Sequence, residues 1–198
     1  SLTTTSTITS DTTPTIEGNA EAGSTVKLYN GSTLLGSATA GSNGAFSITS
    51  STLSEGSYSL HATTTDAAGN ISSSFSALSL IVDATAPNAP TSLTTTSTIT
   101  SDTTPTIEGN AEAGSTVEVF SGSTSLGTTT ADSNGSFFFT PSSALSESTH
   151  SITATATDAA DNTSSASSTL SITVDTTAPI ITGLSGEAGD SKSNYSIK

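Results

Sequence analysis

Acidic residues in short polar loops are the side chains of this sequence best suited to chemistry, and they occur in matched pairs. Asp66-Ala-Ala-Gly-Asn70 in the first half of the chain corresponds to Asp158-Ala-Ala-Asp161-Asn162 in the second half. Carboxylate and amide oxygens are the ligands that Ca²⁺ takes, with about 6–8 around each ion. An Asp in such a loop can instead accept hydrogen bonds from its own backbone in an Asx turn. The spacing alone leaves both interpretations open.

The two histidines are the other candidates for chemistry, and their positions argue against catalysis. When the halves are aligned, His61 stands opposite Thr153 and His150 stands opposite Tyr58, so the two halves do not share a histidine position. Serine occurs 41 times and threonine 42 times, so composition alone can supply a Ser-His-Asp combination. We expect no enzymatic activity.

An internal repeat organises the chain. Residues 1–26 recur without change at residues 92–117. The offset of 91 holds to about Thr49, and one further residue, which we place at Pro141, then changes it to 92. Because repeats of this length are whole domains, we predict domains at residues 1–87 and 88–179.

The last segment, residues 180–198, matches neither copy. It is interpreted as the truncated start of a further module or as a flexible tail. The chain has neither an initiator Met nor a signal peptide, and we expect it to be a piece from the middle of a longer protein.

Apolar residues alternate with polar ones within each copy. Examples are Val26 with Leu28 and then Tyr58, Leu60 and Ala62. Strict alternation is typical of half-buried strands, and turn signals such as YNGS, GSNG and LSEGS separate the runs. About seven short strands per copy predict an all-β chain of tandem Ig-like β-sandwiches in an elongated array.

Composition and charge exclude several functions. The chain of 198 residues carries 17 acidic and three basic side chains, for a net charge of −14. Such a surface repels phosphate backbones and anionic membranes, so we expect no nucleic-acid partner and no membrane insertion. There is no cysteine, which excludes disulfides. We expect a monomer whose partners are the neighbouring repeats.

The predicted fold brings acids of the two copies together. In an Ig-type sandwich the last strand finishes at one end of the domain, and the turns that correspond to those of Glu112 and Asp158 lie at the other end. The linker would therefore carry Asp83, at the end of the first copy, toward Glu112 and Asp158 of the second copy. The candidate metal ligands at this junction are Asp83, Glu112, Asp158 and Asn162. In the first copy the matching set is Glu21, Asp66 and Asn70, which has no preceding linker and should bind more weakly, and Asp175 is the counterpart of Asp83.

The motifs together resemble a known family. The run G-x-A-x-x-G-x-x-V, then N-G, D-x-x-G-N and V-D-x-T-A-P is similar to the bacterial Ig-like repeats of giant surface adhesins, including calcium-dependent RTX adhesins and biofilm-associated proteins. The likeness covers residues 1 to about 179, and the second copy departs from it at Asp161 and Ser148. The resemblance implies an extracellular extender on the bacterial cell surface, and it favours Ca²⁺ over the structural turn.

An alternative function is a binding module for a glycan or for ice. Thr-rich stretches such as TTTSTIT could form a regular polar face, although Thr also fills the solvent face of ordinary strands. Glycan sites commonly stack sugars on aromatic side chains, and this chain has three Tyr and no Trp. The composition therefore favours the extender.

Overall fold

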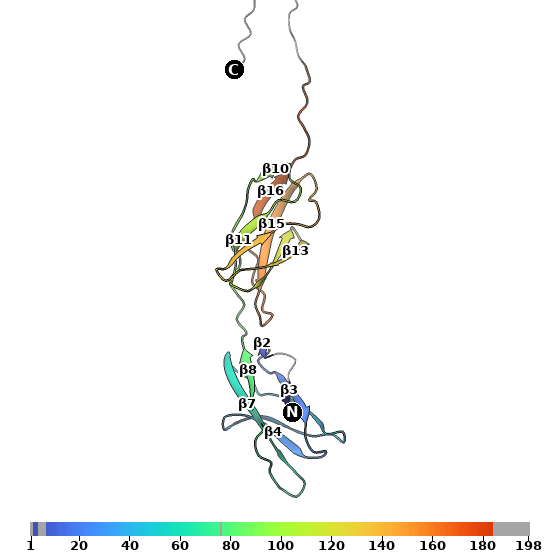
Figure 1. Ribbon diagram of the computed structural model, residues 1–198, viewed down its shortest axis with the longest axis vertical. Helices are drawn as coiled ribbons and strands as arrows, with labels where there is room; N and C mark the ends of the chain where they lie inside the picture. The colour runs from blue at the N-terminus through green and yellow to red at the C-terminus, as the bar shows by residue number, and fades with distance from the viewer. Residues whose placement is uncertain (1, 4–6, 76, 184–198) are drawn as a thin grey trace, which may run out of the picture.

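The computed structural model describes residues 2–3, 7–75 and 77–183, which fold as two β-sandwiches in succession (Figure 1). The described residues contain no helix, so none of them forms a helix that could cross a membrane. The all-β prediction is confirmed. Each domain has eight described strands rather than about seven, and two strands of domain 1 and one of domain 2 contain only two residues.

Domain 1 contains a three-stranded and a five-stranded sheet, with strand orders β1-β3-β6 and β2-β8-β7-β4-β5. The strands are β1 (Leu2–Thr3), β2 (Ile8–Thr9), β3 (Thr15–Asn19), β4 (Thr25–Asn30), β5 (Thr33–Thr39), β6 (Ala45–Thr49), β7 (Gly56–Thr65) and β8 (Leu78–Val82).

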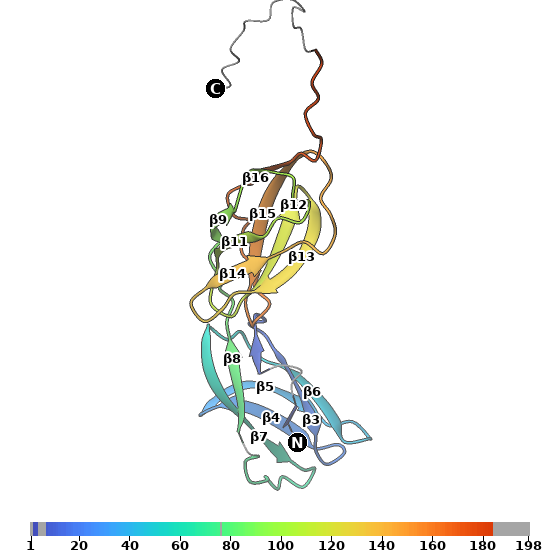
Figure 2. The ribbon, with the colours of Figure 1, turned by 45° about the horizontal axis from the view of Figure 1, so that its top comes forward.

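Domain 2 repeats this topology with the orders β9-β11-β14 and β10-β16-β15-β12-β13 (Figure 2). The strands are β9 (Thr91–Thr95), β10 (Ile99–Thr100), β11 (Ile107–Asn110), β12 (Thr116–Ser121), β13 (Thr124–Thr130), β14 (Ser136–Phe139), β15 (Thr149–Thr157) and β16 (Leu170–Val174).

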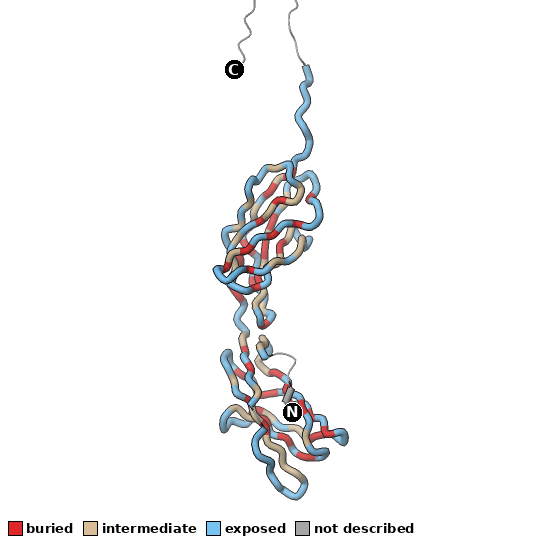
Figure 3. The backbone as a smooth tube through the Cα atoms, in the orientation of Figure 1, coloured by how far each residue is buried: buried red, intermediate tan, exposed pale blue. Residues whose placement is uncertain are grey.

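The alternating residues form the two cores as the sequence predicts. Val26 and Leu28 of β4 point inward, and their counterparts Val117 and Val119 of β12 do the same. Buried residues therefore form one separate group in each domain (Figure 3). Each domain has its own hydrophobic core, which is the condition for an independent folding unit.

The Thr-rich start of each copy divides between the two sheets. In domain 1, β1 pairs antiparallel with β3, whereas β2 pairs parallel with β8. The N–H of Ile81 donates to the carbonyl of Thr7 at 2.8 Å, and that of Asp83 donates to Thr9 at 2.9 Å. The start of each copy thereby contributes to both sheets.

The two domains lie end to end, connected by the segment between β8 and β9 (Figure 1). This segment has no regular secondary structure, and it contains Pro87 and Pro90, which restrict its backbone. After β16 the chain continues without regular structure to residue 183, with Ile180 82% and Ile181 89% exposed. The remainder of the predicted further module, residues 184–198, lies outside the described residues.

Candidate functional site at the junction of the domains

A glutamate fixes the start of the linker. Glu55, in the loop before β7, accepts hydrogen bonds through Oε1 from the N–H of Ala84, at 3.0 Å, and from the hydroxyl of Thr85. In domain 2, Glu147 accepts from the hydroxyls of Thr176 and Thr177 in the same way. The direction in which the chain leaves each sandwich is therefore set by a carboxylate of that sandwich.

The contacts of Glu147 in domain 2 also lower the pKa of its carboxyl group. The hydroxyls of Thr177 and Thr176 stabilise the carboxylate and hold the pKa of Glu147 below its usual value, against a small opposing effect of burial. Sequence reasoning did not select Glu55 or Glu147. The available signal was that both copies place a Glu before β7 or β15 and a Thr two residues after the final Asp.

The loop after β15 is built on Asp158. Its Oδ1 accepts from the N–H of Ala160 at 2.8 Å and of Asn162 at 2.9 Å, and its Oδ2 accepts from the Asn162 amide at 2.9 Å. Burial raises the pKa of Asp158, but the hydrogen bonds from Asn162 and Ala160 outweigh it and lower the pKa. The Asp is thus an Asx-turn acceptor, as one of the two sequence interpretations predicts.

Domain 1 contains the same loop. Asp66 Oδ1 accepts from the N–H of Ala68 at 2.9 Å and of Asn70 at 2.8 Å, and Oδ2 accepts from the Asn70 amide at 2.8 Å. The Asn70 side chain and the loop N–H groups hold the pKa of Asp66 below its usual value. The loop geometry is therefore intrinsic to the repeat and does not need a neighbouring domain.

A hydrogen bond from the second loop crosses the junction. The amide nitrogen of Asn162 donates to the main-chain carbonyl of Asp83 at 2.8 Å. Asp83 is the residue that follows β8, and its carboxylate accepts from the N–H of Thr85 at 3.2 Å. The structure thus brings Asp83, Asp158 and Asn162 together at the point where the domains meet.

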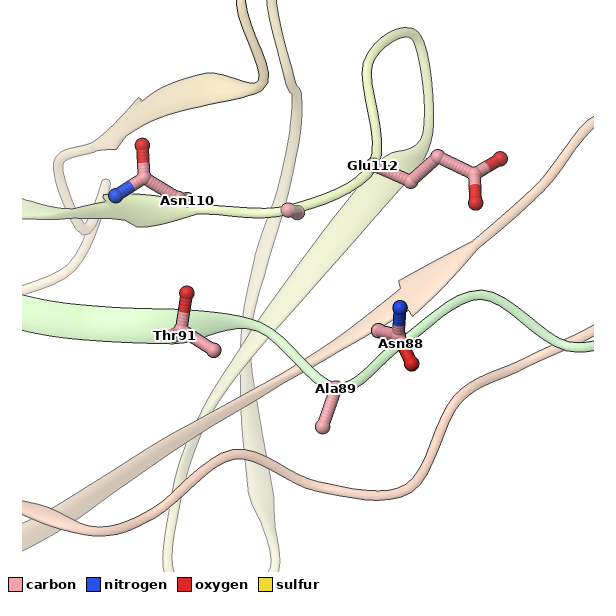
Figure 4. Close-up of a pocket in the computed structure, with 6 residues that line it drawn as sticks. Asn88, Ala89, Thr91, Asn110 and Glu112 are labelled. Carbon is pink, nitrogen blue, oxygen red and sulfur yellow. The ribbon is translucent and has the colours of Figure 1, made fainter.

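Glu112 lies at the same end of domain 2, in the turn before β12. It lines a hollow of about 630 Å³ together with Asn88 and Ala89 of the linker, Thr91, Asn110 and Ala111. Figure 4 shows its carboxylate pointing away from Asn110 and Thr91. Its carbonyl accepts from the N–H and hydroxyl of Ser115, which closes the turn before β12.

The remaining predicted ligands lie at the outer ends of the pair. The loop and turn of domain 1 that hold Asp66, Asn70 and Glu21 correspond to those of domain 2 that face the junction, so they lie at the end of domain 1 away from domain 2 (Figure 1). Asp175 follows β16 at the opposite end of domain 2, where its carboxylate accepts from Thr177 N–H at 3.1 Å.

The junction offers the kinds of ligand atom that bind a hard cation. These atoms are nevertheless arranged as a hydrogen-bonded loop. Asp158, the Asn162 amide and the Asp83 carbonyl all supply oxygen. The Asn162 amide, however, directs its nitrogen toward Asp83 and Asp158. Among the described residues, no group of three Asp, Glu or His side chains is placed to hold a metal ion. The calcium site stays a prediction.

The histidines have structural contacts. His150 Nε2 donates to the carbonyl of Ser146 at 2.9 Å, and Nδ1 lies 3.0 Å from the hydroxyl of Ser121. In domain 1 the hydroxyl of Tyr58 donates to the carbonyl of Ser54 at 2.7 Å, so the two residues make the same contact. His61 stacks on Tyr29, a contact that the sequence did not predict.

The family model of the bacterial Ig-like domain matches this chain twice, over residues 2–84 and 84–176. The chain belongs to the bacterial Ig-like domain family. The match covers both repeats in tandem, so the predicted family is confirmed. The junction described above is accordingly the contact between two consecutive bacterial Ig-like domains.

One of the similar solved structures shows the same fold. The fibronectin(III)-like modules of CbhA from Clostridium thermocellum are 19% identical, with a TM-score of 0.53 over 88% of this chain and 94% of that chain. A biofilm-associated protein BSP domain is 28% identical with a TM-score of 0.36, and tandem repeats from the extending region of a large adhesion protein are 21% identical with a TM-score of 0.37. The matches cover 87% and 89% of this chain but only 29% and 48% of those two chains. No curated protein sequence matches the chain.

Proposed function

We propose that this pair of bacterial Ig-like domains is a non-enzymatic extender segment of an exported adhesin, acting outside the cell at its surface. Its task is to hold another part of the parent protein at a distance. The observation that supports this most directly is the end-to-end arrangement of two separately cored domains (Figure 3). An added repeat then adds length without altering the cores already present.

Stiffness at the junction is the second requirement of an extender. Residues 1–87 carry six acids and one lysine, and residues 88–179 carry nine acids and no base. Two such domains repel each other at low salt. The Asn162–Asp83 hydrogen bond and the glutamate contacts at the linker oppose this repulsion without a cation.

We further propose that Ca²⁺ strengthens this junction. The Asp158 carboxylate, the Asn162 amide oxygen and Asp83 would hold the ion, with Glu112 as a further acidic ligand from the adjacent turn. The ion would supply positive charge between two acidic ends and replace a hydrogen bond by several ionic contacts. We expect a modest affinity, near about 10⁻⁴–10⁻³ M, as is common for extracellular calcium modules.

The experiment compares the wild-type chain with calcium and with chelator, using small-angle scattering for the spread of inter-domain angles and thermal melting for stability. Calcium should narrow the spread and raise the melting temperature. Asp158→Ala should abolish both responses. Asp66→Ala removes the equivalent carboxylate from the outer end of domain 1 and is the matched control, so it should leave the scattering response intact.

The results separate the two levels of the proposal. If chelator alters neither the scattering nor the melting of the wild type, calcium has no role at the junction. If the domains fold back on each other or tumble without any preferred angle in both conditions, the extender itself is the wrong function.

A further inference from the structure

The outer face of the five-stranded sheet in domain 1 differs from an ordinary polar face. The rows that run across β5, β4 and β7 are defined by strand pairing, and paired residues share a face. One row is Leu34, Tyr29 and His61, and the next is Ser37, Lys27 and Thr63. Leu34 is 49% exposed although it is apolar. An apolar, aromatic row beside a lysine on an open face is typical of a binding surface.

The two rings of this row stack on each other and are half-buried. The ring centroids of Tyr29 and His61 lie 5.5 Å apart and their planes differ by 16°. Nearly parallel rings at that separation overlap only in part, so part of each ring face stays uncovered. Both rings line a shallow hollow of about 310 Å³, together with Lys27, Thr63, Thr65 and Ile71, which is 71% exposed.

The charge of this face is opposite to that of the molecule. Within the three rows formed by Thr25, Lys27 and Tyr29 with their partners on β5 and β7, Lys27 is the charged residue and none is acidic. Adjacent rows are two residues apart along the strand, which is about 6.6 Å. A ligand of sugar size can therefore touch the rings and the ammonium group at once.

We propose that this face binds an acidic saccharide, such as a chain of hexuronic acids. The apolar C–H face of a sugar ring packs on Tyr29 and His61, and its carboxylate pairs with Lys27. Hydroxyls of Thr63 and Thr65 lie along the same hollow and can bond to sugar hydroxyls. This binding site is separate from the junction and does not depend on the extender function.

Domain 2 supplies an internal control. It has Glu118, Phe120 and Thr153 where domain 1 has Lys27, Tyr29 and His61. Glu118 accepts a hydrogen bond from Ser125 at 2.6 Å. The same sheet face therefore has an acid instead of a base, and it lacks the His of the stacked pair. Binding should be confined to domain 1.

The experiment is an NMR titration of the intact chain with trigalacturonic acid, its methyl ester and hexaglutamate. Trigalacturonic acid should shift amides of β4 and β7 and leave β12 and β15 unchanged. Lys27→Glu and His61→Thr introduce the residues that domain 2 already carries, so the fold should be retained. Each should weaken binding at least about tenfold, and the ester, which lacks the charge, should bind as weakly.

Three outcomes would overturn the proposal. The first is the absence of shifts up to about 20 mM, well above the millimolar range of weak binding. The second is equal shifts in both domains, which would mean nonspecific contact. The third is an equal response to hexaglutamate, which would show that the face recognises negative charge on a peptide rather than a sugar.

Discussion

Asp161 adopts a backbone conformation that does not suit its residue type. Its φ is +67°, whereas the equivalent position in domain 1 is Gly69 with a φ of +87°. The left-handed region costs an L-residue about 1–2 kcal/mol, and less for Asp than for most residues. The loop nevertheless keeps its hydrogen bonds to Asp158, so domain 2 tolerates this strain at its junction end.

Asp161→Gly should therefore stabilise domain 2. We expect the free energy of unfolding to rise by up to about 1 kcal/mol, because relief of the left-handed conformation exceeds the added freedom of Gly in the unfolded chain. Hydrogen exchange of the β15 and β16 amides measures this for domain 2 alone. The reciprocal change, Gly69→Asp, should lower the protection of β7. A fall in protection of β15 in Asp161→Gly would contradict the explanation.

At the scale of elements, the strands could be predicted because apolar residues alternate where one face is buried. Leu60 and Ala62 are buried on β7 as the pattern requires. The split of the Thr-rich start into β1 and β2 could not be predicted, since a run of Thr has no apolar period. The stacking of His61 on Tyr29 also depends on the register that pairs them across β4 and β7.

The turn between β5 and β6 is closed by a close backbone approach. Gly44 has a φ of +82°, and the N–H of Ala20 donates to its carbonyl at 2.8 Å. A Cβ at Gly44 would lie 2.6 Å from the carbonyl oxygen of Ala20, whereas a Cβ at Gly23, with a φ of +78°, would meet nothing within 4 Å. The two glycines have nearly the same φ, but they differ in the space that is available for a Cβ atom.

Gly44→Ala should consequently cost more stability than Gly23→Ala. We expect about 1 kcal/mol for Gly23→Ala, from backbone conformation alone, and at least about 2 kcal/mol for Gly44→Ala, because the turn must also move. Hydrogen exchange of the β3 and β6 amides provides the measurement. Equal losses in the two variants would show that the contact with Ala20 is unimportant.

At the scale of the whole molecule, the sequence indicated which loops would face the junction but not their contacts. The Asx loop around Asp158 follows from local spacing. The bond from Asn162 to Asp83 depends on the angle between two domains, and no local pattern encodes an angle. The glutamate contact with Thr85 likewise joins residues about thirty positions apart.

Asn162→Ala should loosen the junction even without calcium. A hydrogen bond of this kind contributes about 1 kcal/mol, which corresponds to about a fivefold change in the population of the closed junction. In chelator, ¹⁵N relaxation should give a shorter rotational correlation time for each domain of the variant. Asn70→Ala removes the equivalent amide where no domain contact is described and should leave both correlation times unchanged. If both variants tumble alike, the bond does not restrain the junction.

The parallel pairing of β2 with β8, and of β10 with β16, has a mechanical consequence. When the two ends of a domain are pulled apart, β2 and β8 are drawn in opposite directions along their own axes. The bonds from Ile81 to Thr7 and from Asp83 to Thr9 are then sheared together and cannot be peeled apart one at a time. A tether that must survive flow gains resistance from this geometry, because rupture requires several bonds to fail at once.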